Sequence, residues 1–285
     1  MADHARAPMT RSHKVTNQTC RARYLLISVL ILWVAPYLQA SSLVCRFADE
    51  EGKLLRDVQT QLTPAGKEEH QFQKSDKKGE AVFRDLKPGE FELLAQLKGH
   101  APLKWSVQFS ADQTLELTLM TQQGFERMDK EATDAINGQQ YSKAVAILDK
   151  LLKAYPLDAQ SHDHLARAYA GMGDEDKALA EAKEATQLDP HYSDSLLEIR
   201  RFILVTRGDK ALRDLDFSKA ADTFESLVKL APQDAKAYYG LALAYGHQQK
   251  FEQALSAINK ALELDPQNAS YQQVKTILEA HAAGH

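Results

Sequence analysis

One pattern of small residues and prolines returns four times between residues 125 and 266, and it constrains the fold more than any other feature. Its alanine markers are Ala144, Ala178, Ala220 and Ala254. Its proline markers are Pro156, Pro190, Pro232 and Pro266. Both series have spacings of 34, 42 and 34 residues, so two independent markers keep one register. A period of this size indicates an array of stacked units.

Each unit is predicted to be two helices joined by a turn. Apolar residues lie four and seven positions after each marker alanine, for example Ala182 and Ala185 after Ala178, and this spacing defines one face of a helix. Proline ends this second helix because it has no N–H to donate. A single pair cannot bury its apolar face alone, so neighbouring units must stack.

The pattern resembles the tetratricopeptide repeat. The second unit carries it at His162, Leu165, Ala166, Tyr169, Ala178, Ala182, Ala185 and Pro190, and the fourth at Tyr238, Leu241, Ala242, Tyr245, Ala254, Ile258, Ala261 and Pro266. The resemblance implies four units, at residues 125–158, 159–192, 193–234 and 235–268. An amphipathic segment over residues 269–283 is predicted to cap the last exposed face.

The third unit departs from the period, because its markers are spaced 42 rather than 34 residues from those of the second unit. Apolar residues from Leu196 to Leu215 keep near-helical spacing, which favours a first helix about two turns longer than usual. The alternative is a helix of normal length that ends near Gly208 and Asp209 and is followed by an extra loop.

Residues 42–120 show alternating rather than helical periodicity. Short strand-like segments, such as Val58 to Leu62 and Glu90 to Leu97, are separated by turn signals such as Asp76 to Gly79. About six or seven short strands at this spacing favour a small all-β sandwich. The expected fold is therefore multidomain, all-β and then all-α: a small Greek-key β sandwich followed by an α-solenoid of four helix pairs and a capping helix.

The order of the turns resembles the carboxypeptidase regulatory-like domain, a family with a transthyretin-like Greek-key sandwich. The matching pieces are Asp49 to Gly52, Ser75 to Gly79, the run from Phe83 to Phe91 and Lys98 to His100. The resemblance implies an accessory module without catalytic residues. Residues 121–124 are predicted to be a hinge too short for the two modules to tumble independently.

The first 40 residues are predicted to direct export. A basic lead precedes the apolar run from Tyr24 to Leu38, and small residues follow it. This is the pattern of a secretory signal peptide cleaved after Ala40. The alternative is a retained membrane anchor. Both readings place the body outside the cytoplasm, in the periplasm. Lipid attachment at Cys45 is a further alternative, against which we favour a half-buried strand cysteine.

Charge argues against nucleic acid as a partner. Residues 1–40 hold five of the 35 basic residues and one of the 39 acidic residues, so the remainder has 30 basic and 38 acidic residues, a net charge of −8 with His neutral. The chain after residue 40 therefore lacks the excess of Lys and Arg with which proteins neutralise nucleic-acid phosphates.

No motif supports catalysis. The sequence contains no HExxH, GxxxxGK[ST], GxGxxG or GxSxG. His162 and His164 lie two positions apart on a predicted helix and therefore face different ways. Ser75 and Lys78 form an SxxK pair, but in a turn. We therefore predict a protein that is not an enzyme and needs no cofactor or metal.

The remaining candidate site is a surface. In tetratricopeptide arrays the first helix of each pair lines a concave groove, and the register gives seven groove candidates: Asp129, Thr133, Asp163, Arg167, Tyr239, Leu243 and His247. The family's carboxylate clamp uses Lys and Asn, whereas Asp129 and Thr133 stand at the first such pair here, which puts a peptide C-terminus in doubt as the ligand. Arg167 could pair with an acidic group.

The resulting hypothesis is an exported interaction scaffold whose groove binds a protein or peptide, with membrane contact only through an uncleaved N-terminal segment. One alternative is a structural or assembly factor of a cell-envelope complex. Another is a carbohydrate-binding protein that uses Trp105 and Phe109 of the β module.

Overall fold

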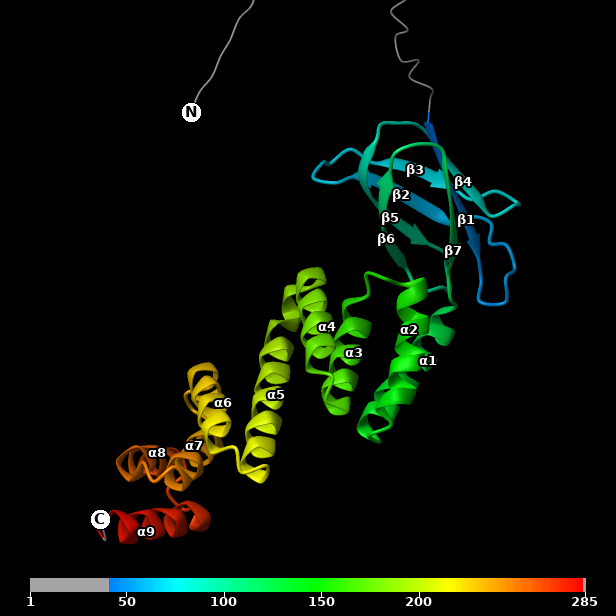
Figure 1. Cartoon of the computed structure of the whole chain (residues 1–285). Coiled ribbons are helices and arrows are strands. Elements are labelled where there is room, and N and C mark those ends of the chain that lie inside the picture. Colours follow the sequence, from blue (N-terminus) through cyan, green and yellow to red (C-terminus); the bar gives the residue numbers. More distant parts are fainter. Residues whose placement is uncertain (1–40, 284–285) are drawn as a thin grey trace, which may run out of the picture. The chain divides into compact units, whose positions relative to one another are not determined.

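The computed structural model describes residues 41–283, which form two β-sheets followed by a succession of helices (Figure 1). The predicted fold class, a β module followed by a repeat-type α-solenoid, is confirmed. The predicted signal peptide or anchor lies outside the described residues. Within residues 41–283, no helix combines the length and apolarity that a membrane span requires.

The β module contains seven strands in two sheets. They are β1 (Ser41–Ala48), β2 (Gln59–Pro64), β3 (Gln71–Lys74), β4 (Glu80–Leu86), β5 (Gly89–Gln96), β6 (Leu103–Phe109) and β7 (Gln113–Thr118). One sheet has the order β4-β1-β7 and the other β3-β2-β5-β6. Strand β1 runs antiparallel to β4 and parallel to β7. The chain therefore crosses repeatedly between the sheets, and their inner faces share one core.

Alternation along β1 explains which side chains enter that core. Leu43, Cys45 and Phe47 are fully buried, while the residues between them lie on the outer face. Cys45 is thus more deeply buried than the half-buried position predicted for it, and burial raises the pKa of its thiol to about 12. A thiol with so high a pKa is an inert packing group.

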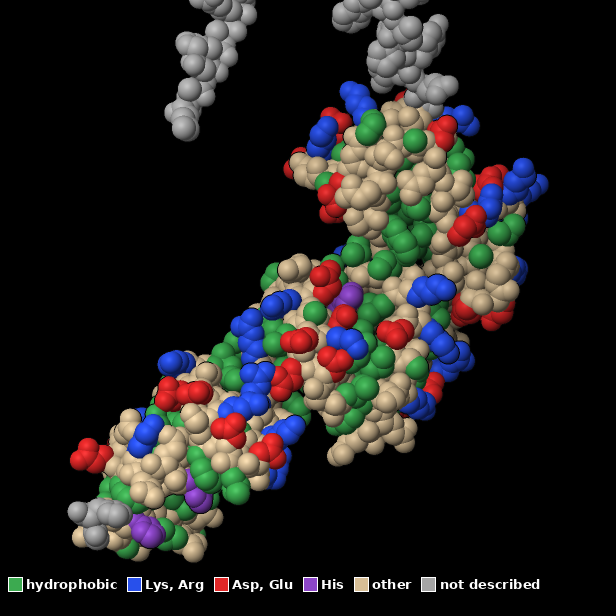
Figure 2. All heavy atoms as spheres, viewed as in Figure 1, with side chains coloured by type: hydrophobic (Ala, Val, Ile, Leu, Met, Phe, Trp, Pro, Cys, Tyr) green, Lys and Arg blue, Asp and Glu red, His purple; other side chains and the backbone are tan. Residues whose placement is uncertain are grey.

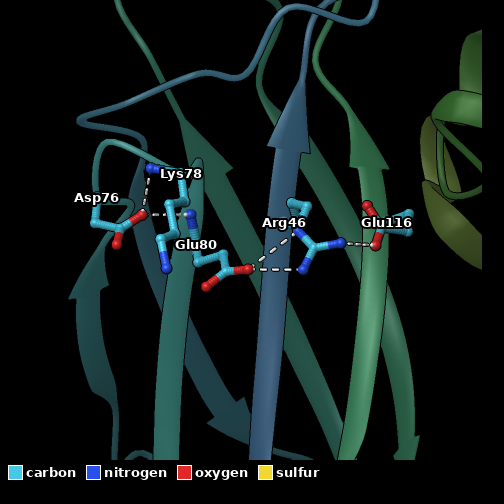
Figure 3. A network of polar contacts seen from close by, with 5 residues as sticks. All are labelled: Arg46, Asp76, Lys78, Glu80 and Glu116. Carbon is cyan, nitrogen blue, oxygen red and sulfur yellow. Dashed lines mark hydrogen bonds and ion pairs between the residues drawn. The ribbon is translucent and has the colours of Figure 1, made fainter.

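On the outer face of the three-stranded sheet, Arg46 of β1 joins both neighbouring strands (Figure 3). Its Nη2 lies 2.7 Å from Glu80 Oε1 of β4, and its Nη1 lies 2.6 Å from Glu116 Oε1 of β7. Asp76 orders the turn before β4, because its Oδ1 accepts from the backbone N–H groups of Lys78 and Glu80 at 2.7 and 3.1 Å. These contacts fix the pairing of strands far apart in sequence.

Strand β3 was not predicted. All of its residues are exposed, and the Phe72 side chain is 68% exposed at the edge of the four-stranded sheet. The sequence around Gln71–Lys74 therefore has no alternation of buried and exposed residues from which a strand could be recognised.

The described helices are arranged in pairs, as the sequence repeat predicts. They are α1 (Gln122–Asn137), α2 (Tyr141–Ala154), α3 (Ala159–Met172), α4 (Glu175–Leu188), α5 (Ser193–Arg213), α6 (Phe217–Leu230), α7 (Ala235–His247), α8 (Phe251–Leu264) and α9 (Ala269–Ala283), with a short 3₁₀ turn, η1 (Pro190–Tyr192), before α5. Aspartates cap several of them: the carboxylates of Asp158, Asp174, Asp216 and Asp234 accept from backbone N–H groups at the starts of α3, α4, α6 and α7. Such caps satisfy donors that have no partner within the helix.

The longer third unit is explained by one continuous helix of 21 residues, α5, as its apolar spacing predicted. Its N-terminal half contributes Ile199 and Ile203 to a buried cluster with α3 and α4. Its C-terminal half contributes Ala211 to a second cluster that continues to α9. Helix α5 thus belongs to two cores.

The first helices are packed directly against the β module. The backbone N–H of Met120, after β7, donates to Tyr155 Oη of the α2–α3 connection at 2.7 Å. Thr121, the N-cap of α1, donates its N–H and hydroxyl to the Glu50 carboxylate at 3.1 and 3.0 Å. One buried cluster includes residues of both sheets and of α1 to α3.

Candidate partner-binding groove

The first helices of the units form a continuous row, because α1 contacts α3, α3 contacts α5, α5 contacts α7 and α7 contacts α9. The seven candidate groove residues all lie on α1, α3 and α7. The structure separates them into side chains that hold the row together and side chains that line hollows.

Asp163 belongs to the first group. Its side chain is 3% exposed, and its Oδ2 lies 2.9 Å from Arg167 Nε. Ser195 of α5 donates its hydroxyl to Asp163 Oδ1, and Arg167 Nη2 donates to Ser195 Oγ at 3.3 Å. A buried carboxylate needs such partners to offset the loss of water. Asp163 therefore links α3 to α5 and is not free to meet a ligand.

Asp129 has a similar linking position between α1 and α3. Its Oδ2 accepts from Gln160 Nε2 at 3.0 Å, and its Oδ1 lies 3.2 Å from His164 Nδ1. Thr133, one turn further along α1, is partly buried. His162 and His164 do point to different partners, since His162 contacts Glu181 of α4.

A first hollow lies between α1, α3 and α5 and has a volume of about 570 Å³. We call it the central hollow. Arg167 is the one predicted groove residue in its lining. The other lining residues are Ile136, Tyr141, Ala170, Gly171, Asp194, Ser195, Glu198, Ile199 and Phe202.

No groove candidate was predicted on α5, although Phe202 lies in the central hollow. The lengthened third unit left the register of its first helix open, so no residue of α5 could be assigned to the groove face. The available signal was an apolar side chain, Phe202, three positions after the core residue Ile199.

A second hollow, of about 270 Å³, lies between α7, α8 and α9, and we call it the terminal hollow. Two predicted groove residues, Leu243 and His247, line it together with Phe251, Ile277 and His281. The His247 ring stacks on Phe217 with 4.3 Å between centroids, and the His281 ring stacks on Phe251 at 5.9 Å. Each His–Phe pair is separated by 30 residues in the chain, and the two pairs are one repeat of 34 residues apart.

Tyr239 does not line the terminal hollow. Its ring stacks on Tyr271 of α9 with 4.9 Å between centroids, and Tyr271 is buried. Tyr239 therefore attaches the last helix to α7.

Acidic and basic side chains are interspersed over the face of the helices that Figure 2 shows. Within residues 41–283, no three His, Cys, Asp or Glu side chains are placed to hold a metal ion together. The site is thus a row of helices with hollows that combine apolar and polar side chains.

Two ranges of the array match the tetratricopeptide repeat family model: residues 130–193 and 205–269. The tetratricopeptide repeats predicted from the sequence are therefore confirmed. The interval between the two matches lies within α5, the helix shared by the two buried clusters.

Several curated proteins are similar to part of the chain. Cellulose synthase operon protein C of Escherichia coli K12 is 31% identical over 113 residues, which are 38% of this chain and 10% of that protein. DnaJ homolog subfamily C member 3 of Mus musculus is 20% identical over 210 residues, which are 59% of this chain and 42% of that protein. The chain thus spans less than half the length of either relative.

Solved structures that match part of the chain include MamA from Desulfovibrio magneticus RS-1. That structure is 20% identical to this chain, covers 56% of it and 92% of its own length, and has a TM-score of 0.36.

Proposed function

We propose that this protein is an exported scaffold whose helical groove binds a protein or peptide. The observation that carries the proposal is the pair of hollows along the first helices, each of which combines exposed apolar side chains with polar ones. Apolar anchors surrounded by polar contacts are the arrangement through which proteins bind one another. The tetratricopeptide repeats support the same proposal, because stacked repeats present extended binding surfaces.

Export rests on the sequence of residues 1–40 alone, and a periplasmic location belongs to the same proposal. The resemblance of the β module to the carboxypeptidase regulatory-like domain likewise stays a prediction. In this proposal the module is an accessory that covers the first face of the array, which a repeat protein must protect from water.

An assembly factor of a cell-envelope complex is the second candidate. The Escherichia coli relative is named for a cellulose synthase operon, and a scaffold that holds several proteins would use the same groove. Recovery of one stable, large complex would favour this candidate over transient capture of a peptide.

The carbohydrate-binding alternative is weakened by the placement of the two side chains on which it depended. Phe109 is buried, with an edge-to-face contact to Phe91 at 6.2 Å, and Trp105 is partly buried against the same core. The Phe109 ring is therefore not available as a platform for a sugar, and part of the Trp105 surface is used in packing.

The proposal is tested by affinity purification of the full chain from an envelope fraction. Thr133→Arg on α1 and Leu243→Arg on α7 would each place a bulky charge in the groove, and we expect both to reduce recovery of the partner. Glu252→Arg, at an exposed position on α8, is the matched control. Circular dichroism checks that each variant is folded. Equal recovery from the wild type and both folded groove variants would contradict the proposal.

A further inference from the structure

The floor of the central hollow is apolar and incompletely covered. Ile199 and Ala170 are buried, whereas the Phe202 side chain is 49% exposed. Ile136 and Tyr141 contribute partly buried apolar surface from α1 and α2. Removing such surface from water favours association. The hollow therefore favours an apolar side chain as its occupant.

The positive charge at the hollow is already neutralised. Arg167 is directed to the buried Asp163 carboxylate and to Ser195, so a guanidinium that turned to a ligand would leave Asp163 with the neutral Ser195 hydroxyl in place of its cationic partner. Removing one partner of a buried charge pair is strongly unfavourable. Arg167 therefore forms part of the wall of the hollow, and the Asp163 carboxylate offsets its charge there.

The negative charges at the hollow remain accessible. Asp194 is exposed in the first turn of α5, and the Glu198 side chain is 72% exposed one turn later. Arg201 lies 3.4 Å from Glu198, but it is held by the nearly buried Asp234 at 2.8 Å. The two carboxylates on the rim thus leave an acidic edge beside the exposed Phe202 ring.

From this arrangement we propose that the central hollow binds a basic amphipathic segment of a partner protein. An apolar side chain of that segment packs on Phe202 and Ile199, and a neighbouring Lys or Arg pairs with Asp194 and Glu198. Charge complementarity selects this occupant, since an acidic segment would face like charges. The inference rests on the proposed function, because it specifies the chemistry of a ligand in the same groove.

The test uses the full chain and three labelled synthetic peptides of equal length with the same Leu and Phe positions. The remaining positions carry Lys, Gln or Glu. We expect fluorescence anisotropy to show the tightest binding for the Lys peptide and a loss of affinity as salt is raised. Phe202→Ser should weaken binding about tenfold or more, as for the loss of a central anchor. Asp194→Asn combined with Glu198→Gln should remove most of the salt dependence.

Matched controls separate the hollow from general attraction to an acidic protein. Leu197→Ser changes an exposed apolar residue of α5 that does not line the hollow, and Asp222→Asn combined with Glu252→Gln removes two exposed charges from α6 and α8. We expect these variants to bind the Lys peptide as the wild type does. Equal effects of the control and hollow variants, or equal binding of the Glu peptide, would overturn the proposal.

Two further outcomes distinguish this inference from the proposed function. If Thr133→Arg and Leu243→Arg abolish partner recovery while Phe202→Ser and the Asp194/Glu198 variant retain it, the groove binds a partner but the proposed ligand chemistry is wrong. If light scattering shows that Phe202→Ser converts a dimer into a monomer, the hollow contacts a second copy of the chain, and the peptide proposal fails.

Discussion

At the scale of single residues, His162 shows how a repeat position can acquire an electrostatic role. It stands where the repeat pattern places an aromatic side chain, and both of its ring nitrogens meet acceptors: Nδ1 lies 2.6 Å from Glu181 Oε2, and Nε2 lies 3.0 Å from the Pro156 carbonyl. Only a doubly protonated ring can donate to both. Burial is the largest single influence and disfavours the charged ring, but the two hydrogen bonds and the negative charges of Glu181 and Glu184 together outweigh burial and raise the pKa of His162.

A raised pKa in the folded state makes stability depend on pH. The contribution of His162 is fully present below its unfolded pKa of about 6.5 and is lost as the pH rises through its higher folded pKa. We therefore expect the urea midpoint of the wild type to fall between about pH 6 and about pH 9. His162→Phe, which keeps an aromatic ring, should reduce this fall. Identical pH profiles for both proteins would show that His162 is not the titrating group.

Close approach of helices also depends on single glycines. A Cβ at Gly240 of α7 would lie 2.4 Å from Cζ of the buried Phe224, and one at Gly208 of α5 would lie 2.7 Å from the same atom. The Phe224 ring therefore fills space that is open because Gly208 and Gly240 have no side chain.

Gly240→Ala should therefore destabilise the protein by about 1–3 kcal/mol, the usual cost of overpacking a core. Gly89→Ala, where a Cβ would meet open space, should change stability by no more than about 0.5 kcal/mol. Urea unfolding measures both. In a Phe224→Leu background the effect of Gly240→Ala should shrink, because the residues in contact are coupled. If Gly240→Ala were equally destabilising in the Phe224→Leu background, contact with the Phe224 ring would not be the cause.

At the scale of elements, a helix or strand could be predicted from the sequence where its buried residues recur with a regular period. The paired helices were predictable because their small and apolar residues recur on one face. Strand β3 was not, since its side chains are exposed and its pairing is specified by the backbone of β2. The central hollow was missed because α5 carries apolar side chains in more than one direction, such as Ile203 and Phe202, so periodicity could not identify its groove face.

Helix α5 is also the element in which the two buried clusters meet. Thr206 is exposed near its middle, and proline there would remove an interior hydrogen bond at a cost of about 3 kcal/mol or more. We expect Thr206→Pro to separate urea unfolding into two steps, which hydrogen exchange would assign to the α3–α4 and α6–α9 sides. Thr206→Ala is the control and should unfold as the wild type does. A single, merely shifted transition for Thr206→Pro would contradict the linking role of α5.

At the scale of the whole described molecule, the sandwich and the first helices share a core, and Tyr155 holds them together. Its hydroxyl accepts from the buried Met120 N–H, and burial raises the pKa of Tyr155 to about 12. Because both modules contribute to this hydrogen bond, its loss should destabilise the sandwich and the helices together.

Tyr155→Phe would leave the Met120 N–H without its acceptor, which costs about 1–3 kcal/mol. We expect the same fall in the free energy of unfolding from two signals. Tryptophan fluorescence, measured in a Trp33→Phe background so that it comes from Trp105, reports on the sandwich, and far-ultraviolet circular dichroism reports on the helices. Tyr141→Phe keeps the ring that packs at Gly171. In this variant the free energy of unfolding from either signal should change by no more than about 0.5 kcal/mol. A shift of the helical signal alone would show that the modules unfold separately.

The division of buried residues into successive clusters has a mechanical consequence. If a partner held near α9 were pulled, the load would reach the C-terminal helices first, where each unit is supported only by its neighbours. The helices joined to the sandwich would resist longest, because their core extends into two sheets. The described chain would then lengthen in stages and act as a tether that yields gradually.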